Sequence, residues 1–435
     1  MRRRRGIDYL QTLPSGLRLA WDDQGSLGTM AIGLFVGVGS RAETVASNWG
    51  AAHFLEHLVF KGAGTLDGAA IARAMDDLGG EINAYTTREH TVFYAKVLAS
   101  RAWDAWQLLR TMVFYPRLAT ADVEKERQVI IAERHEALDD PEDRCEQAYM
   151  KSLYADADLV HDILGTGRSI RALSTARLKR FYRQWYRPAG MCVALSGQGA
   201  AALADRIREQ EMVPARPEVA AVGEPVTVPP IPVPRELLLR ADGEQVHTMV
   251  GTAAPPLDDP NYEATQLAAT ILGGQNSSRL WQQLREEAGL VYTVYAAYSA
   301  HSQWGDLSIY LAVHPRSLTE ALRLAGNTLR TFLTQGPSPQ EIERARVLIT
   351  TALAFSLETP EGRMVRLGRW GLANAPPPSL ADVRQRLEAV GPQDVQSVAK
   401  QLWTDPGEVA LAAVGPIPRR IAPLRSYFFS PSWES

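Results

Sequence analysis

The sequence predicts an α+β protein built of two homologous domains, each a mostly antiparallel sheet with helices packed on one face. A proline-dense segment divides the 435 residues into two halves of similar length. Both halves show the same succession of strand and helix patterns, and each closes with an apolar strand-like run. We therefore expect a domain over 1–210, a proline-rich linker over 211–235 and a second domain over 236–435, as a duplicated chain would give.

The two halves follow one order of elements. The first half predicts a strand, then helical segments, a hairpin, two long helices and a closing strand. The strand, the hairpin, the two long helices and the closing strand lie at 30–38, 82–86 with 91–97, 100–115, 121–138 and 189–196. The second half predicts a strand, two helices, a hairpin, two more helices and a closing strand, at 246–251, 260–273, 277–287, 291–298 with 305–313, 316–333, 338–357 and 408–414. Between the halves, the prolines exclude a helix or a central strand and are typical of an extended linker.

Composition and charge narrow the classes of function. The formal net charge of −3 gives no reason to expect a nucleic acid or an anionic membrane as a partner. No apolar run reaches 18 residues, so we expect no membrane-spanning helix. The arginines after Met1 are not followed by an apolar segment, which argues against a secretory signal. Two cysteines, Cys145 and Cys192, fit a reducing compartment, and we expect a cytoplasmic protein.

The segment 48–62 predicts a buried helix, with Asn48 as its N-cap and Gly62 as its stop. Apart from a lysine beside the final glycine, its ionisable residues are His53, Glu56 and His57. At about 100° per residue, these three share an arc of about 100° on an otherwise apolar helix.

Burying two imidazoles and a carboxylate together is unfavourable unless a partner satisfies them, and a divalent metal ion does so. Histidines at i and i+4 can bind one ion, and neutral imidazole suits zinc. Glu56 lies beside the pair, where it could take a proton from water. The order H-x-x-E-H is the inverzincin signature. The alternative is a helix with two satisfied core histidines and an ion-paired glutamate.

A catalytic zinc ion commonly has three protein ligands and one open position. The helical pattern over 121–136 offers several candidates for the third ligand: Glu124, Glu126, Glu133, His135 and Glu136. Glu126 and Glu133 are two turns apart and lie on one face. Spacing alone does not choose among the five.

These motifs resemble the M16 family of zinc metallopeptidases, the pitrilysin and insulin-degrading enzyme family. The similarity is greatest to its shorter subfamily, which includes mitochondrial processing peptidase, and it extends over essentially the whole chain. It implies the LuxS/MPP-like metallohydrolase fold. In that family a glutamate ligand follows the H-x-x-E-H helix by about 70–80 residues, and Glu133 follows His57 by 76. The resemblance thus implies one Zn²⁺ per chain held by His53, His57 and Glu133, with Glu126 as a supporting carboxylate of the catalytic site.

Two further segments resemble family motifs. The segment 79–86 is similar to the edge strand on which peptides bind as an added strand, which implies substrate contacts by Asn83 and Ala84. The segment 277–292 is similar to the arginine–tyrosine motif of the second half, which implies that Arg285 and Tyr292 contact substrate and stabilise a developing oxyanion. Without the resemblance, the segment 79–86 would be interpreted as an ordinary hairpin strand, Arg285 as a surface arginine and Tyr292 as an aromatic residue of a strand. One stretch, 154–158, departs from the His-Pro-containing sequence common in the family.

The implied function is that of a zinc metalloendopeptidase, with Glu56 as general base, that hydrolyses internal bonds of unfolded peptides bound as an added strand inside a clamshell chamber. The helix over 261–272 in the second half has no histidine pair, so that half is the non-catalytic copy. The implied partners are a peptide substrate and a second copy of the chain, or alternatively a paralogue in a heterodimer. The competing function is a catalytically silent or partner-dependent subunit, structural or processing, of a heteromeric complex. His90 and His161 receive no role.

Overall fold

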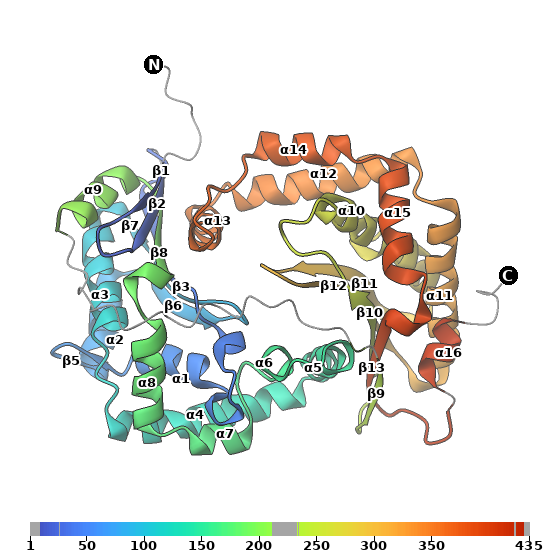
Figure 1. Cartoon of the computed structure of the whole chain (residues 1–435), viewed down its shortest axis with the longest axis horizontal. Coiled ribbons are helices and arrows are strands. Elements are labelled where there is room, and N and C mark those ends of the chain that lie inside the picture. Colours follow the sequence, from blue (N-terminus) through green and yellow to red (C-terminus); the bar gives the residue numbers. More distant parts are fainter. Residues whose placement is uncertain (1–8, 26, 211–232, 234, 422, 430–435) are drawn as a thin grey trace. The chain divides into compact units, whose positions relative to one another are not determined.

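The computed structural model describes residues 9–25, 27–210, 233, 235–421 and 423–429, and these form two compact units (Figure 1). The first unit comprises Met1–Arg134, His161–Val226 and Ala352–Ser379, and the second comprises His135–Val160, Thr227–Thr351 and Leu380–Ser435. Most of the predicted linker, 211–235, lies outside the described residues.

The first unit contains a six-stranded sheet in the order β1-β2-β8-β3-β7-β6. Only the β2–β8 pair is parallel. The strands are β1 (Tyr9–Thr12), β2 (Arg18–Asp23), β3 (Thr29–Val36), β6 (Glu81–Thr86), β7 (Thr91–Leu98) and β8 (Met191–Gly197). Strand β6 therefore forms one edge of this sheet.

One face of this sheet is covered by helices whose apolar side chains form the larger core. This core joins Leu34 of the sheet to Phe54, Leu109 and Leu178 of three different helices. The helices of this part of the chain are α1 (Ala51–Leu58), α2 (Gly68–Leu78), α3 (Ala102–Phe114), α4 (Thr120–Asp139), α7 (Gly167–Ala172), α8 (Thr175–Trp185) and α9 (Ala200–Gln210), and a short hairpin pairs β4 (Gly62–Ala63) with β5 (Leu66–Asp67).

The second unit repeats the design around a five-stranded sheet in the order β11-β12-β10-β13-β9, in which only β13–β9 is parallel. Its strands are β9 (Glu236–Arg240), β10 (Val246–Ala253), β11 (Val291–Ala300), β12 (Gly305–Val313) and β13 (Val409–Gly415). The following helices belong wholly or mainly to it: α5 (Pro141–Leu153), α6 (Ala157–Val160), α10 (Tyr262–Gly273), α11 (Leu318–Gln335), α12 (Pro339–Ser356), α14 (Leu380–Ala389), α15 (Pro392–Trp403) and α16 (Leu424–Phe428). The predicted two-domain α+β architecture, with mostly antiparallel sheets, is confirmed.

Each sheet is also covered on its other face by one helix that comes from the opposite half of the sequence. In the first unit this helix is α13 (Pro360–Leu372), whose Met364 and Leu367 pack on Phe35 and Ala194. In the second unit it is α5, whose Tyr149 packs with the sheet residue Tyr310. The central strands are buried along their whole length, as expected of strands with both faces covered.

Both cysteines are free and buried, and both lie where these helices meet the sheets. Cys145 is on α5, and its Sγ donates to the carbonyl of His247 on β10 at 3.3 Å. Cys192 is on β8 in the small core that α13 covers, where Gly371 of α13 leaves room for its sulfur. No helix among the described residues is long and apolar enough to cross a bilayer.

The predicted helix over 48–62 differs from the structure at both ends. Asn48 ends a 3₁₀ turn and is not the N-cap, because α1 begins at Ala51 after Gly50, whose φ is +90°. The helix ends at Leu58, and Gly62 starts β4. Farther along, the predicted helix over 277–287 contains a π-helical segment, Trp281–Glu287.

Candidate metal centre

Helix α1 places His53, Glu56 and His57 at the first unit's site. Phe54, Leu55 and Leu58 are fully or almost fully buried in the core, which fixes the rotation of the helix about its axis. The two imidazole rings are one turn apart, with centroids separated by 4.7 Å. The i, i+4 spacing read from the sequence therefore brings both rings to one place.

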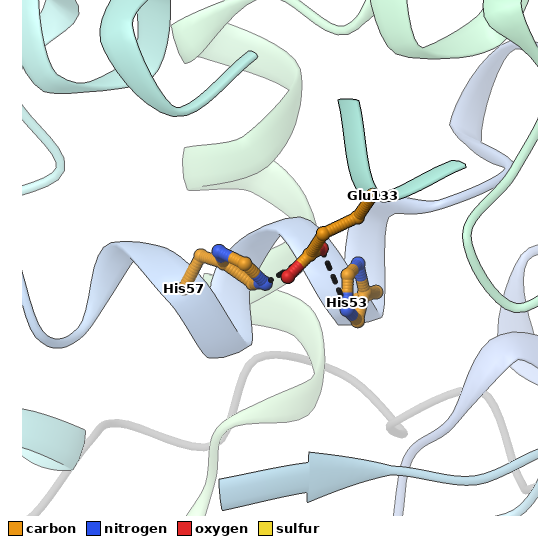
Figure 2. Close-up of side chains that lie close together, drawn as sticks. All are labelled: His53, His57 and Glu133. Atoms are coloured by element: carbon orange, nitrogen blue, oxygen red, sulfur yellow. Dashed lines mark ion pairs between the residues drawn. The ribbon is translucent and has the colours of Figure 1, made fainter. Parts of the chain in front are cut away.

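Glu133 of α4 completes the group. Its Oε2 lies 3.4 Å from His57 Nε2 and 3.8 Å from His53 Nε2 (Figure 2). One ligand atom from each of these three residues lies within 4.8 Å of the other two. Of the alternatives left open on its helix, Glu133 is the one that joins both histidines among the described residues.

The donor set fits a metal ion. The Oε2 atom of Glu133 is buried and makes no hydrogen bond, which is unfavourable for a carboxylate oxygen without a cation. Burial, together with the charge of His57, lowers the pKa of His53 to about 3. The imidazole of His53 is therefore neutral and ready to coordinate at physiological pH. Two imidazoles and one carboxylate form a His₂Glu set of the kind found in catalytic zinc sites.

Glu126 and Lys61 support His57 from behind. Glu126 Oε2 lies 3.2 Å from His57 Nδ1, and its side chain is only 6% exposed. Lys61 Nζ lies 3.0 Å from the other carboxylate oxygen. A carboxylate on the second ring nitrogen fixes the tautomer and orientation of a ligand imidazole. Glu126 was expected here from the family resemblance, whereas Lys61 was not expected from the sequence.

Glu56 lies on the same helix face as the histidines and has its own partner. Thr86, the last residue of β6, donates its hydroxyl to Glu56 Oε2 at 2.5 Å. Burial raises the pKa of Glu56, whereas the Thr86 hydrogen bond and His57 act to lower it and Glu133 adds to the rise. Sequence reasoning missed this role of Thr86, since the two partners are 30 positions apart.

The two residues predicted to bind substrate lie on β6, at the edge of the sheet. Asn83 is exposed and Ala84 is half-buried. Asn83 Oδ1 accepts the N–H of Ala84 at 2.8 Å. An added strand that used this N–H would replace a bond that the neighbouring side chain now makes.

Arg285 and Tyr292 belong to the second unit, which brings them together. The Arg285 guanidinium carbon lies 5.3 Å from the ring centroid of Tyr292 and 5.1 Å from that of Trp281. Arg285 is on the π-helical segment, and Tyr292 is 68% exposed on β11. The contact of Arg285 with Trp281 was not expected from the sequence.

Known proteins match this chain along most of its length. Residues 22–167 match the model of the insulinase (peptidase family M16) domain, and 172–347 match that of the peptidase M16 inactive domain. An uncharacterized zinc protease of Mycobacterium tuberculosis is 36% identical over 397 residues, which cover 90% of each chain. The chain belongs to the M16 peptidase family. The family expected from the motifs is thereby confirmed.

A further sequence relative and two solved structures also match most of this chain. The uncharacterized zinc protease YmxG of Bacillus subtilis is 29% identical over 405 residues, which cover 93% of this chain and 97% of the relative. The crystal structure of a peptidase M16 inactive domain from Pseudomonas fluorescens matches with a TM-score of 0.86 at 21% identity, over 96% of this chain and 99% of its own. A protease from Helicobacter pylori matches with a TM-score of 0.87 at 18% identity, over 94% and 99%. At these identities the two structures show the shared fold.

Proposed function

We propose that this M16 protein is a zinc-dependent endopeptidase that hydrolyses internal bonds of unfolded peptides. The observation that carries the proposal is the convergence of Glu133 from α4 with His53 and His57 from α1, the helix that also carries Glu56. The relatives' name of zinc protease is consistent with it.

Zinc would be held by His53, His57 and Glu133, and it would supply Lewis acidity that polarises water and carbonyl groups. Glu56 would take a proton from the attacking water and return it to the leaving nitrogen. A carboxylate whose pKa is raised by burial can both accept and release a proton more easily near neutral pH. Thr86 would hold this carboxylate in place.

The edge strand β6 supports peptides as the substrate class. Main-chain groups at a sheet edge can pair with an extended chain without reading its side chains, so unfolded segments fit and folded domains do not. Asn83 and Ala84 would make these contacts. Arg285 and Tyr292 would offer a cation and a phenol to the developing oxyanion, and the proposed assembly is a homodimer.

The test is cleavage of a quenched, unstructured peptide of about 15–20 residues by wild type and by Glu56→Gln, with bound zinc measured in both. Removal of a general base should lower kcat by at least about 10²-fold while zinc content stays unchanged. Glu124→Gln is the matched control, because Glu124 is a 62% exposed glutamate on α4 with the same charge to lose.

Two results would contradict the endopeptidase. Glu56→Gln as active as wild type would remove Glu56 from the reaction. Zinc-loaded wild type with no turnover would favour the silent or partner-dependent subunit, which mixing with a paralogue would then address.

A further inference from the structure

A buried carboxylate caps the metal-site helix from outside its own sequence. Glu43 is completely buried, and its Oε1 accepts the N–H of Ala52 at 2.7 Å. Its Oε2 accepts the N–H of Gly50 at 2.6 Å. The first N–H groups of a helix have no partner within the helix, and no N-cap side chain supplies one to α1. Glu43 therefore satisfies the N–H of the N-cap residue Gly50 and that of Ala52 in the first turn of α1.

His161 holds this carboxylate in place. Its Nε2 lies 2.9 Å from Glu43 Oε2, with side-chain exposures of 1% and 0% for the two residues. The imidazole ring is stacked on Trp49 with 4.9 Å between centroids and 6° between planes. Burial raises the pKa of Glu43, and the bonds from His161, Ala52 and Gly50 oppose this rise. Complete burial of this carboxylate is tolerated because both of its oxygens accept hydrogen bonds.

The loop that begins at His161 also contacts the helix of the third ligand. The carbonyl of Gly165 accepts from Arg134 Nε at 3.1 Å, and Arg134 follows Glu133 directly on α4. Gly165 has a φ of +74°, and a Cβ there would lie 2.5 Å from the carbonyl oxygen of Trp49. The loop backbone therefore packs directly on the backbone that enters α1, and it also binds Arg134 of α4.

We propose that Glu43 is a positioning residue for the metal centre, held by His161 so that α1 presents His53 and His57 to Glu133. Helix α1 has only eight residues, and His53 is the third of them. Loss of the cap would loosen the turn that carries this ligand, while the buried Leu58 would still hold the other end. This inference rests on the proposed function only in assuming that the centre binds zinc.

The test measures zinc affinity by chelator competition, together with the visible spectrum of the Co²⁺ form, in the full-length chain. We expect Glu43→Gln and His161→Leu to weaken zinc binding by roughly 10-fold, the lower end of what loss of a residue hydrogen-bonded to a ligand costs, because Glu43 acts through the backbone of α1. His161→Gln retains an N–H donor for Glu43 and should stay close to wild type. In the peptidase assay, kcat should fall with affinity while KM stays nearly constant.

Asp67→Ala is the matched control, because alanine cannot cap a helix. Asp67 caps the neighbouring helix α2 in the same unit by accepting the N–H of Ala70 at 2.8 Å. Its loss should lower the melting temperature without changing zinc affinity or the Co²⁺ spectrum. All affinities are measured well below each variant's melting temperature, so that only folded protein is compared.

The inference would be overturned if Glu43→Gln melted at a lower temperature but bound zinc and turned over like wild type, because the pair would then serve the core alone. If Glu43→Gln does not fold, the zinc affinities of His161→Leu and His161→Gln test the inference instead, and equal affinities in these two variants would overturn it. If wild type binds zinc but cleaves no peptide, the proposed endopeptidase function would be overturned. The positioning role of Glu43 would then be tested by the zinc affinities of the variants alone. Wild type that binds no zinc would overturn both.

Discussion

Glu56 is subject to two opposing influences on its charge. Burial in the first unit disfavours the carboxylate, and the hydroxyl of Thr86 favours it by donating a hydrogen bond. A general base acts only when it is ionised, so activity is lost as the pH falls through its pKa. The loss of activity toward low pH forms the acidic limb of the pH profile. The pH of this limb is therefore set in part by Thr86, which lies on β6.

Thr86→Val is expected to move the acidic limb of the kcat/KM profile to higher pH. The hydroxyl lowers the pKa of Glu56, so its removal lets the pKa rise further above the ordinary value. Loss of a hydrogen bond to a charged group is worth about 1.5–3 kcal/mol, or roughly 10- to 100-fold in kcat/KM below the limb. Thr111→Val serves as the control, since this hydroxyl bonds only to its own helix at the carbonyl of Gln107. A limb that stays in place would show that Thr86 does not act on Glu56.

The residues of the centre differ in how readily the sequence predicts them. His53, Glu56 and His57 come from a single helical turn, so spacing alone places them together. Glu133 could be selected as the third ligand only from the spacing seen in the family, because its own helix offers several equivalent acidic residues. Glu43 and His161 are 118 positions apart, and neither neighbourhood contains a pattern that links them. Such pairs are brought together by tertiary packing and cannot be found from local periodicity.

Among the elements, the predicted strands and the long helices 121–138 and 338–357 agree closely with the structure, whereas the start of α1 does not, and β1, β2 and β9 were not predicted. The predicted hairpin strands 91–97 and 305–313 agree with β7 and β12 within a residue, because apolar runs between turns define strands well. The start of α1 was misplaced because its cap is a glutamate seven residues before Gly50, rather than the polar residue next to the helix. The sequence analysis also did not assign α5 and α13 to the opposite sheets, since an apolar helix face does not specify which sheet it covers.

The start of α12 is held by a bidentate ion pair that should give stability a measurable pH dependence. Arg279 donates to both carboxylate oxygens of Glu341 at 2.7 and 2.8 Å, and Ser338 adds two more hydrogen bonds. Burial acts to raise the pKa of Glu341, but these bonds outweigh it and lower the pKa to about 2. A folded-state pKa below the ordinary value stabilises the fold above that value, and the contribution is lost as the pH falls toward 2.

We therefore expect Glu341→Gln to lower the free energy of unfolding by about 1–3 kcal/mol at pH 7. The difference from wild type should narrow as the pH is lowered from about 4.5 toward 2. Denaturant unfolding at a series of pH values measures it. Glu343→Gln is the control, because its carboxylate is 66% exposed and pairs only at the surface. A difference that does not change with pH would assign the loss to packing rather than to charge.

At the scale of the whole molecule, the exchange of helices makes the two halves of the chain depend on each other. The segment 1–210 contains the first sheet but not α13, and 236–435 contains the second sheet but not α5. Each fragment alone would leave one apolar sheet face uncovered, with Phe35 on one and Tyr310 on the other. The proline-rich boundary at 211–235 in the sequence therefore does not coincide with the division of the chain into compact units.

Fragments 1–210 and 236–435 are expected to be poorly soluble when expressed separately and to associate when expressed together. Co-purification from a tag on one fragment, followed by circular dichroism, measures this. Met364→Asp in the second fragment should abolish association, because Met364 is fully buried against the first sheet. Val347→Asp, at a residue that is 56% exposed, should not. A stable, separately folded 1–210 would contradict this dependence.

The positions of the two thiols give an intrinsic probe of this arrangement. Burial raises the pKa of Cys192 to about 12 and that of Cys145 above its ordinary value, so neither thiol is a ready nucleophile in the folded protein. A thiol-specific reagent should modify Cys192 only when α13 lifts from β8, and Cys145 only when α5 leaves β10. Mass spectrometry of timed modification would thus report the opening of each helix separately, without any introduced label. The sequence contains two cysteines in all, so each signal has a single source.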